Sequence, residues 1–299
     1  MDIVGLGSSN VDYLGVIEDL PGWDGRTYLL SFDIQGGGNV ATGMVAAAKL
    51  GADVGWIGQV GDDEFGRFII NDFHRYGINH SRIRVEQSGV FPQAIVLVHR
   101  TTGRRVLLPH RRNPPPLLLD DSDRAYICSA RYLHLDNCFP EASCLATEWA
   151  RASAVKVSLD AGYLTPQVED VVRLTDILIV SERFAREFTG CDALRKALHD
   201  LSLFGAEITM VTRGPEGCIG LVDGHEFALP AFRVEVIDTT GAGDVFHGAF
   251  LYGLVQGWDA IRTARFASAV AAMKCTKLGG RAGIPTLPEV EKFLGKNAK

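Results

Sequence analysis

The sequence has 299 residues, enough for one large α/β domain or two smaller ones. Apolar residues make up 46% and charged residues 22%, which excludes a disordered or fibrous chain. The net charge of −6 argues against nucleic-acid binding, because a basic surface dominates that affinity. No apolar run approaches the roughly 18 residues of a membrane span, and the first residues show no secretory signal. We therefore expect a cytoplasmic protein that binds neither nucleic acid nor a membrane.

Cysteine and glycine are the informative residue types. The six cysteines include no Cys-x-x-Cys pair, which predicts reduced thiols and not a zinc or redox site. The 33 glycines are about 11% of the chain, above the roughly 7% that is usual. They gather in three clusters, at 36–38, 241–243 and 279–283.

The hydrophobic pattern predicts strands and helices in alternation. In chain order, we expect strands at 2–7, 11–17 and 27–34, a helix at 39–50, a strand at 54–57, a helix at 64–76, strands at 94–98 and 105–108, and then strands at 132–135, 155–159, 177–180, 208–211, 219–222 and 233–237 with helices at 141–153, 168–174, 182–188, 193–204, 242–256, 259–275 and 287–294. This alternation predicts a parallel sheet with helices on both faces. The two early hairpins do not fit it, and they predict a small separate sheet that acts as a lid.

The second glycine cluster carries the strongest chemical signal. Residues 239–244 (Thr-Thr-Gly-Ala-Gly-Asp) open directly into an apolar helix. A glycine-rich turn at a helix start presents unpaired backbone N–H groups and the positive end of the helix dipole, which together bind an anion such as phosphate. Asp244 on the first turn is suitably placed to take a proton from an acceptor hydroxyl in phosphoryl transfer. A plain helix cap is the alternative interpretation.

Other nucleotide motifs are absent or weak. The sole Gly-Lys pair, 295–296, lies near the chain end and forms no Walker A loop. Residues 5–10 (Gly-Leu-Gly-Ser-Ser-Asn) nearly match the dinucleotide fingerprint, but Asn10 replaces the third glycine and a strand is expected to follow. A nicotinamide-dependent oxidoreductase is therefore a weak alternative.

The sequence resembles a known family along nearly its whole length. Residues 238–248 (DTTGAGDVFHG) resemble the second signature of the ribokinase-like (PfkB) carbohydrate kinases. The first signature is matched by 36–39, Gly51, Gly58, 61–63 and Gly66. Residues 10–12 match the sugar-binding motif that follows the first strand, and 212–214 with Gly217 match a nucleotide-loop motif. All of these motifs occur along the chain in the order found in the family. The matches run from residue 3 to about 290.

The resemblance implies both a fold and an activity. The fold would be a ribokinase-like three-layer α/β/α sandwich with a mostly parallel sheet, forming one kinase domain over 1–299 with a β-lid from about 11–35 and 90–110. The activity would be transfer of the γ-phosphate of ATP, bound with Mg²⁺, to a hydroxyl of a sugar or nucleoside. A homodimer formed through the β-lid is also implied.

The family's functional residues carry over onto three groups of positions in this sequence. The resemblance implies Asp244 as the catalytic base, with an anion hole formed by Gly241, Ala242 and Gly243. The sugar would be bound by Asn10, Asp12, Gly37, Gly38 and Asn39. ATP would be bound by Thr212, Gly214, Gly217, Thr239 and Gly280.

The metal region departs from the family pattern. Where the family often has Asn-x-x-Glu, this sequence has Ser181 and Phe184. Glu182 is a weak substitute candidate for the magnesium region, and a helix-start acid that favours the dipole is the alternative. Asp238 and Thr240 lie where some relatives bind a monovalent cation, so K⁺ is a further candidate ligand.

The substrate is less closely defined. Residues 274–276 and 280–285, together with His247, are similar to sulfofructose kinase and related ketohexose kinases, which suggests a ketohexose or furanose substrate. Arg111 follows a lid strand and is a candidate to bind the anion of a charged sugar; a solvated basic turn is the alternative. The exact sugar and the phosphorylated hydroxyl stay open.

Two further functions stay open at this stage. A nucleoside kinase of the same fold would use lid aromatics such as Tyr13, Tyr28 and Phe32 to cover a base. A non-catalytic sugar-binding or regulatory protein could also retain the kinase fold. The complete 239–244 motif with Asp244 argues against a non-catalytic protein, while the altered Asn-x-x-Glu segment leaves it possible.

Overall fold

The chain folds into two β-sheets of unequal size, as seen in a computed structural model that describes residues 1–87, 92–110, 115–165 and 167–297. The large sheet contains β1 (Ile3–Leu6), β4 (Val54–Gly61), β5 (Asn79–Glu86), β8 (Tyr132–Leu135), β9 (Lys156–Ala161), β10 (Ile177–Ser181), β11 (Ile208–Thr212), β12 (Cys218–Val222) and β13 (His225–Leu229). Its strand order is β13-β12-β11-β10-β9-β8-β1-β4-β5, and the pairs are parallel except at β12 and β13.

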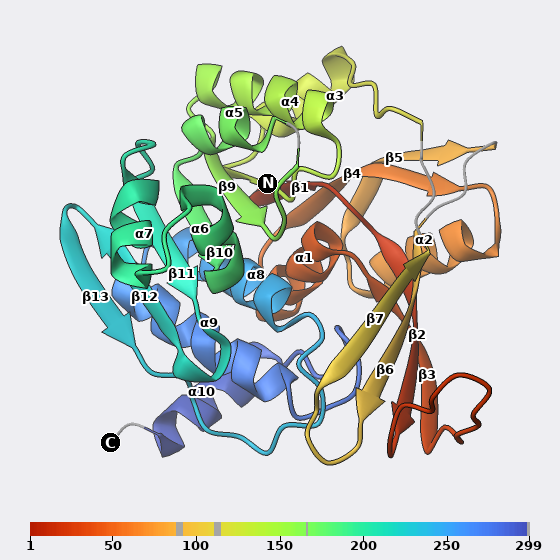
Figure 1. The fold of residues 1–299 in the computed structure, drawn as a ribbon. Helices are drawn as coiled ribbons and strands as arrows, with labels where there is room; N and C mark the ends of the chain where they lie inside the picture. The colour runs from red at the N-terminus through yellow and green to blue at the C-terminus, as the bar shows by residue number, and fades with distance from the viewer. Residues whose placement is uncertain (88–91, 111–114, 166, 298–299) are drawn as a thin grey trace.

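Two helical layers cover the large sheet. One layer consists of α1 (Asn39–Leu50), α2 (Glu64–Arg75), α8 (Ala242–Val255), α9 (Ala260–Lys274) and α10 (Leu287–Lys296), and the other of α3 (Asp121–Cys128), α4 (Pro140–Ala152), α5 (Val168–Arg173), α6 (Glu182–Thr189) and α7 (Leu194–Ser202). Neighbouring strand residues such as Ile3 and Val4 point into opposite hydrophobic cores. The chain is therefore a three-layer α/β/α sandwich of the expected kind (Figure 1).

The small sheet is the expected lid. It contains β2 (Asn10–Ile17), β3 (Ser31–Gly37), β6 (Gln93–His99) and β7 (Arg105–His110) in the order β3-β2-β6-β7, and Figure 1 shows it projecting from one side of the sandwich. One face of the lid buries Leu14, Val96 and Val98, with Leu278 packed against them. The lid therefore rests on the segment that follows α9.

Most of the expected elements are present, and the errors concern pairing between distant segments. The expected strand at 233–237 is wrong, because the structure has an irregular segment there. The N–H groups of Ile237 and Asp238 donate to the Cys275 carbonyl oxygen at the end of α9, and Val236 and Ile237 stay about 40% exposed. Strands β5 and β13 and helix α3 were not expected. Among the described residues, none of the helices has the length and apolar character needed to cross a bilayer.

Helices α1 and α8 pack against each other through glycine. A Cβ atom on Gly248 would lie 1.9 Å from the Gly43 carbonyl oxygen, and one on Gly43 would lie 3.1 Å from the Asp244 carbonyl oxygen. The two backbones therefore touch, with no room for a side chain at Gly248.

We predict that Gly248→Ala lowers the melting temperature by several degrees. The added methyl group overpacks the helix contact, which costs about 1–3 kcal/mol, and 1 kcal/mol shifts Tm by roughly 2–4 °C in domains of this size class. Differential scanning calorimetry tests this, with Gly295→Ala in α10 as the control, because a Cβ there meets nothing within 4 Å. An unchanged Tm for Gly248→Ala would contradict the tight contact.

Candidate active site

The start of α8 has the geometry expected for anion binding. Gly241 caps the helix with a φ of 74°, and a Cβ atom on it would lie 3.0 Å from the Cα atom of Gly280. The first turn of a helix leaves backbone N–H groups without intrahelical partners, and Gly243 is exposed with open space beside it. The predicted anion hole of Gly241, Ala242 and Gly243 is thus an accessible helix start beside Gly280.

The five residues expected to bind the sugar lie together where β2, β3 and α1 meet. Asn10 pairs with Gly37 across the sheet, and its side-chain Nδ2 donates to Asp12 Oδ1. A Cβ atom on Gly37 would lie 2.3 Å from Asp12 Oδ2, so only glycine allows this carboxyl to lie against the β3 backbone. Gly38, at a φ of 92°, then caps α1, which begins at Asn39.

Two further carboxyls belong to this site and were not foreseen. Asp136 follows β8, and its Oδ2 accepts hydrogen bonds from the backbone N (2.9 Å) and hydroxyl (2.5 Å) of Ser8. Asp160 lies in β9, with its Oδ2 3.5 Å from Asn39 Nδ2. Both acids follow apolar residues at the carboxyl ends of parallel strands, which is where ligands bind in such sheets. An acidic residue directly after the apolar residues of a predicted strand is therefore the sequence signal that could have identified Asp136 and Asp160.

Burial of these acids shifts their titration towards neutral pH. Burial raises the pKa of Asp12 to about 6 and that of Asp160 to about 7, with Asp136 adding to the effect on Asp160. Burial, together with Asp160, raises the pKa of Asp244 well above its ordinary value, and Arg105 opposes this shift. A carboxyl that titrates near the working pH is suited to act as a proton acceptor.

A buried histidine lies beneath the carboxyl cluster. His247 Nε2 is 3.4 Å from Asp160 Oδ1, and burial lowers the pKa of His247 to about 3. Its ring lies tilted by 37° against that of His134, with 5.4 Å between the ring centroids, and burial also lowers the pKa of His134. His247 is therefore neutral at physiological pH, and it supplies no charge to offset that of Asp160.

The lid contributes an arginine near the start of α8. Arg105 in β7 pairs with Val98, whose side chain lies on the buried face of the lid. Its Nη1 donates to the Thr239 hydroxyl over 2.6 Å, just before the start of α8. The sequence offers Arg111 as the candidate to bind the anion of a charged sugar. Arg111 lies outside the described residues, so its role stays a prediction.

Arg281 joins the lid to the segment that contains Gly280. Its guanidinium is fully buried, forms an ion pair with Asp72, and donates from Nη2 to the Gly37 carbonyl oxygen over 2.7 Å. Gln35 Oε1 accepts from the backbone N–H groups of Arg281 (3.2 Å) and Ala282 (3.1 Å). The polypeptide around Gly280 is therefore tied directly to β3.

The remaining residues expected to bind ATP are more dispersed. Thr212 ends β11 and donates to the Val180 carbonyl oxygen over 3.3 Å. Gly214 has a φ of 55°, and a Cβ atom on Gly217 would lie 1.9 Å from the Leu229 carbonyl oxygen. These described contacts place the three residues at the carboxyl edge of the sheet, against β10 and β13. Thr239, in contrast, lies at the helix start.

The altered metal segment serves a structural purpose. The Ser181 hydroxyl caps α6 by accepting from the Phe184 N–H over 3.1 Å, and Phe184 is fully buried. Glu182 Oε1 accepts from Arg186 Nη2 over 2.7 Å. The weak metal candidate Glu182 therefore has an arginine partner, and its role in binding metal stays a prediction.

The fold and the site together define a class of protein. The glycine-rich start of α8, which is not a P-loop, carries Asp244, a carboxyl whose pKa is raised by burial and by the neighbouring Asp160, Asp12 and Asp136. After β1 the chain enters β2 and not a helix, so the Gly5–Gly7 segment lacks the strand-to-helix turn of a dinucleotide-binding fold. This arrangement is that of a sugar kinase.

Comparison with known proteins identifies the family. A model described as pfkB family carbohydrate kinase matches residues 2–287, and the chain belongs to this family. It is 30% identical to a ribokinase of Haemophilus influenzae over 97% of both chains, and 25% identical to a 5-dehydro-2-deoxygluconokinase of Clostridium beijerinckii over 98% of this chain and 93% of that one. A putative ribokinase from Agrobacterium tumefaciens superposes with a TM-score of 0.89 at 26% identity, covering 99% of this chain and 98% of that one.

We predict that Asp160→Asn stabilises the protein at high pH. The folded state keeps the Asp160 proton up to about pH 7, whereas the unfolded chain releases it near pH 4. The folded state therefore binds more protons in that window, and stability falls as pH rises through it. The asparagine removes this cost, so its Tm should exceed that of the wild type by several degrees at pH 8.

The pH dependence separates this cause from a general packing effect. Thermal unfolding between pH 4 and pH 8.5 should show the gain of Asp160→Asn shrinking towards pH 4. The exposed Asp223→Asn serves as the control and should show no such trend. A gain that is equal at every pH, or a loss at pH 8, would contradict the raised pKa.

Proposed function

We propose that this chain transfers the γ-phosphate of ATP to a hydroxyl of a ketohexose or furanose sugar, with Asp244 as the base. The observation that carries the proposal is the glycine contact between α1 and α8. It brings the sugar-side residues at the start of α1 next to the anion-binding start of α8. Asp244 is close enough to Asp12 and Asp160 for their charges to raise its pKa.

The chemistry follows from these positions. The acceptor hydroxyl, bound near Asp12 and Asn39, gives its proton to the Asp244 carboxylate. Its oxygen forms a bond to the γ-phosphorus while the bond to the bridging oxygen breaks, and ADP leaves. Backbone N–H groups of the α8 start and the Arg105 guanidinium stabilise the negative charge on the transferred group.

Magnesium is proposed to enter with ATP. Mg²⁺ is commonly held through substrate phosphates and water together with one or two carboxylates. The carboxyls near the start of α8 are oxygen donors of the type this cation prefers. When bound, Mg²⁺ neutralises phosphate charge during the transfer.

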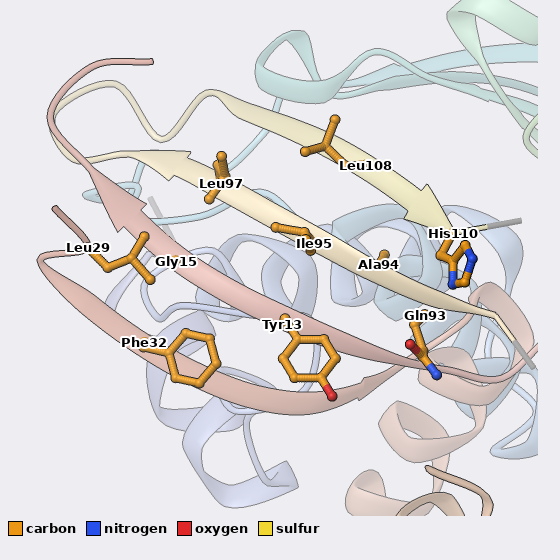
Figure 2. Close-up of a pocket in the computed structure, with 10 residues that line it drawn as sticks. All are labelled: Tyr13, Gly15, Leu29, Phe32, Gln93, Ala94, Ile95, Leu97, Leu108 and His110. Atoms are coloured by element: carbon orange, nitrogen blue, oxygen red, sulfur yellow. The ribbon is translucent and has the colours of Figure 1, made fainter. Parts of the chain in front are cut away.

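The position of the lid aromatics favours a sugar over a nucleoside. Neighbouring strand residues point to opposite faces, so Tyr13 lies on the opposite side of β2 from Asp12. Figure 2 shows Tyr13 with Phe32 on the hollowed face that also carries Ile95, Leu97 and Leu108. Tyr28 is 75% exposed. Tyr13 and Phe32 therefore face away from the residues proposed to bind the sugar, which argues against their covering a base there.

We further propose that two copies associate through the outer face of the lid. This face, defined by Tyr13, Phe32, Ile95, Leu97 and Leu108, is apolar, and Phe32, Ile95 and Leu108 are about 50% exposed. An exposed apolar patch of this kind marks an interaction surface. The opposite face of the lid is turned towards the site. Association through the outer faces would therefore not disturb the contacts between the lid and the site.

The free state of all six cysteines supports a reducing, cytoplasmic environment.

We predict that Asp244→Asn lowers kcat by about 10²- to 10⁴-fold, because general-base catalysis contributes that much. ADP release is measured with Mg-ATP against ketohexoses, their phosphates and sulfonates, sugar acids, pentoses and nucleosides. Asp259→Asn at the start of α9 is the matched control, because asparagine caps a helix as well as aspartate does. Near-normal turnover by Asp244→Asn would rule out the base.

The same panel tests the substrate class. Turnover should be greatest with ketohexoses or furanoses, and a preference for nucleosides would support the alternative kinase. If every compound gave only the substrate-free rate of ATP hydrolysis, the proposed function would be wrong.

We predict that Leu108→Asp converts a dimer to a monomer, because the charge would be buried in the proposed interface. Light scattering after gel filtration should give twice the chain mass of 32.4 kDa for the wild type and for the control Leu203→Asp. Leu203 is 83% exposed and lies beyond α7, away from the lid. A wild-type monomer, or a Leu108→Asp dimer, would contradict the proposed interface.

A further inference from the structure

The loop before α8 is built around a buried lysine. Lys274, the last residue of α9, is fully buried, and its Nζ donates to the Asp238 carbonyl oxygen over 2.9 Å. Asp238 is also fully buried and stands three residues before the α8 cap, Gly241. A buried amine thus contacts the backbone from which the anion-binding turn starts.

The oxygens of Asp238 are all engaged by donors. Its Oδ1 accepts from the backbone N (2.8 Å) and hydroxyl (2.7 Å) of Thr240, and its Oδ2 accepts from the Gly279 backbone N over 2.7 Å. Its carbonyl oxygen accepts from Lys274. Asp238 therefore links the turn before α8 to the segment that contains Gly280.

This arrangement does not fit a monovalent cation at Asp238 and Thr240. Such a cation needs carbonyl and carboxylate oxygens as ligands, and here those of Asp238 already bind hydrogen-bond donors. It would also lie beside the Lys274 side chain, where two positive charges repel each other. The oxygen atoms of this loop are arranged to accept hydrogen bonds, one of them from the Lys274 amine.

Opposing effects act on the charge of Lys274. Buried charges persist in proteins when they are paired. Burial lowers the pKa of Lys274, and the negative charges of Asp238 and Asp244 oppose that shift. Lys274 contacts the carbonyl oxygen of Asp238, three residues before the Gly241 cap, so its side chain lies beside the turn that leads into α8.

We infer that the Lys274 ammonium is the fixed cation of this loop, taking the place of a bound K⁺ and holding the α8 start in the shape that binds phosphate. Lys274 is a positioning residue, because it acts through Asp238. The inference rests on the proposed function, and it deepens that proposal by making nucleotide binding and turnover independent of monovalent cations.

The wild-type protein supplies the first test. The dissociation constant of Mg-ADP is measured by calorimetry in KCl, NaCl and tetramethylammonium chloride at equal ionic strength, and kcat is measured in the same salts with the best sugar of the panel. Both quantities should agree within about twofold across the salts. A tenfold or greater improvement with K⁺ alone would overturn the inference.

Variants supply the second test. Lys274→Met should weaken Mg-ADP binding at least tenfold in tetramethylammonium chloride, while Lys274→Arg retains most of the affinity. Lys277→Met is the control, because Lys277 is an exposed lysine three residues further on. Unchanged Mg-ADP binding by a folded Lys274→Met would contradict the inference. If Lys274→Met does not fold, the inference is tested by Mg-ADP binding of Lys274→Arg and of the wild type in the different salts.

The binding measurement separates this inference from the proposed function. If no sugar is phosphorylated, the proposed function fails, and Mg-ADP binding still reports whether K⁺ is needed. If sugars are phosphorylated but K⁺ tightens Mg-ADP binding tenfold, the kinase proposal stands and the role of Lys274 is wrong.

Discussion

Two glycines, Gly43 of α1 and Gly248 of α8, let these helices touch backbone to backbone. A side chain at Gly248 would force the helices apart, and the starts of the helices would separate with them. One start carries Asn39, which is proposed to bind the sugar, and the other carries Asp244. Because phosphoryl transfer depends on positioning the acceptor and the phosphate within reaction distance, the site depends on this contact between helices.

The contact between α1 and α8 also brings several carboxyls close together, which destabilises their charged forms. Several carboxyls, the buried Asp160 and the half-buried Asp244 among them, lie near one another, and their pKa values rise because the charged forms are poorly solvated. Cations from separate elements offset this charge: Arg105 from the lid, Arg281 from the segment after α9, and Lys274 from α9 itself. The destabilising acids and the compensating cations meet where the substrates are proposed to bind, as is usual for a functional site.

Local sequence signals predicted the elements that local chemistry controls. The helix expected at 39–50 is α1 to the residue, because Gly38 and the left-handed Gly51 mark its ends. The expected strand at 233–237 is wrong, and β13 was missed, because a strand exists only where a distant partner accepts its hydrogen bonds. In the same way, Asp136 and Asp160 join the candidate site only because the sheet places β8 beside β1 and β9 beside β8.

The sequence by itself determined the family, the α/β class and the two glycine-rich helix starts, because each depends on residues adjacent in the chain. It also marked the two hairpins of the lid, although the lid sheet forms only where β2 pairs with the distant β6. The tertiary structure decided which side chains meet at the helix starts. Arg105 reaches Thr239 across 134 positions, and Lys274 reaches Asp238 across 36. Neither contact has a local pattern, since a hydrogen bond between distant residues is set by how the intervening elements pack. For that reason the loop marked in the sequence as a candidate cation site is found to be built around a lysine.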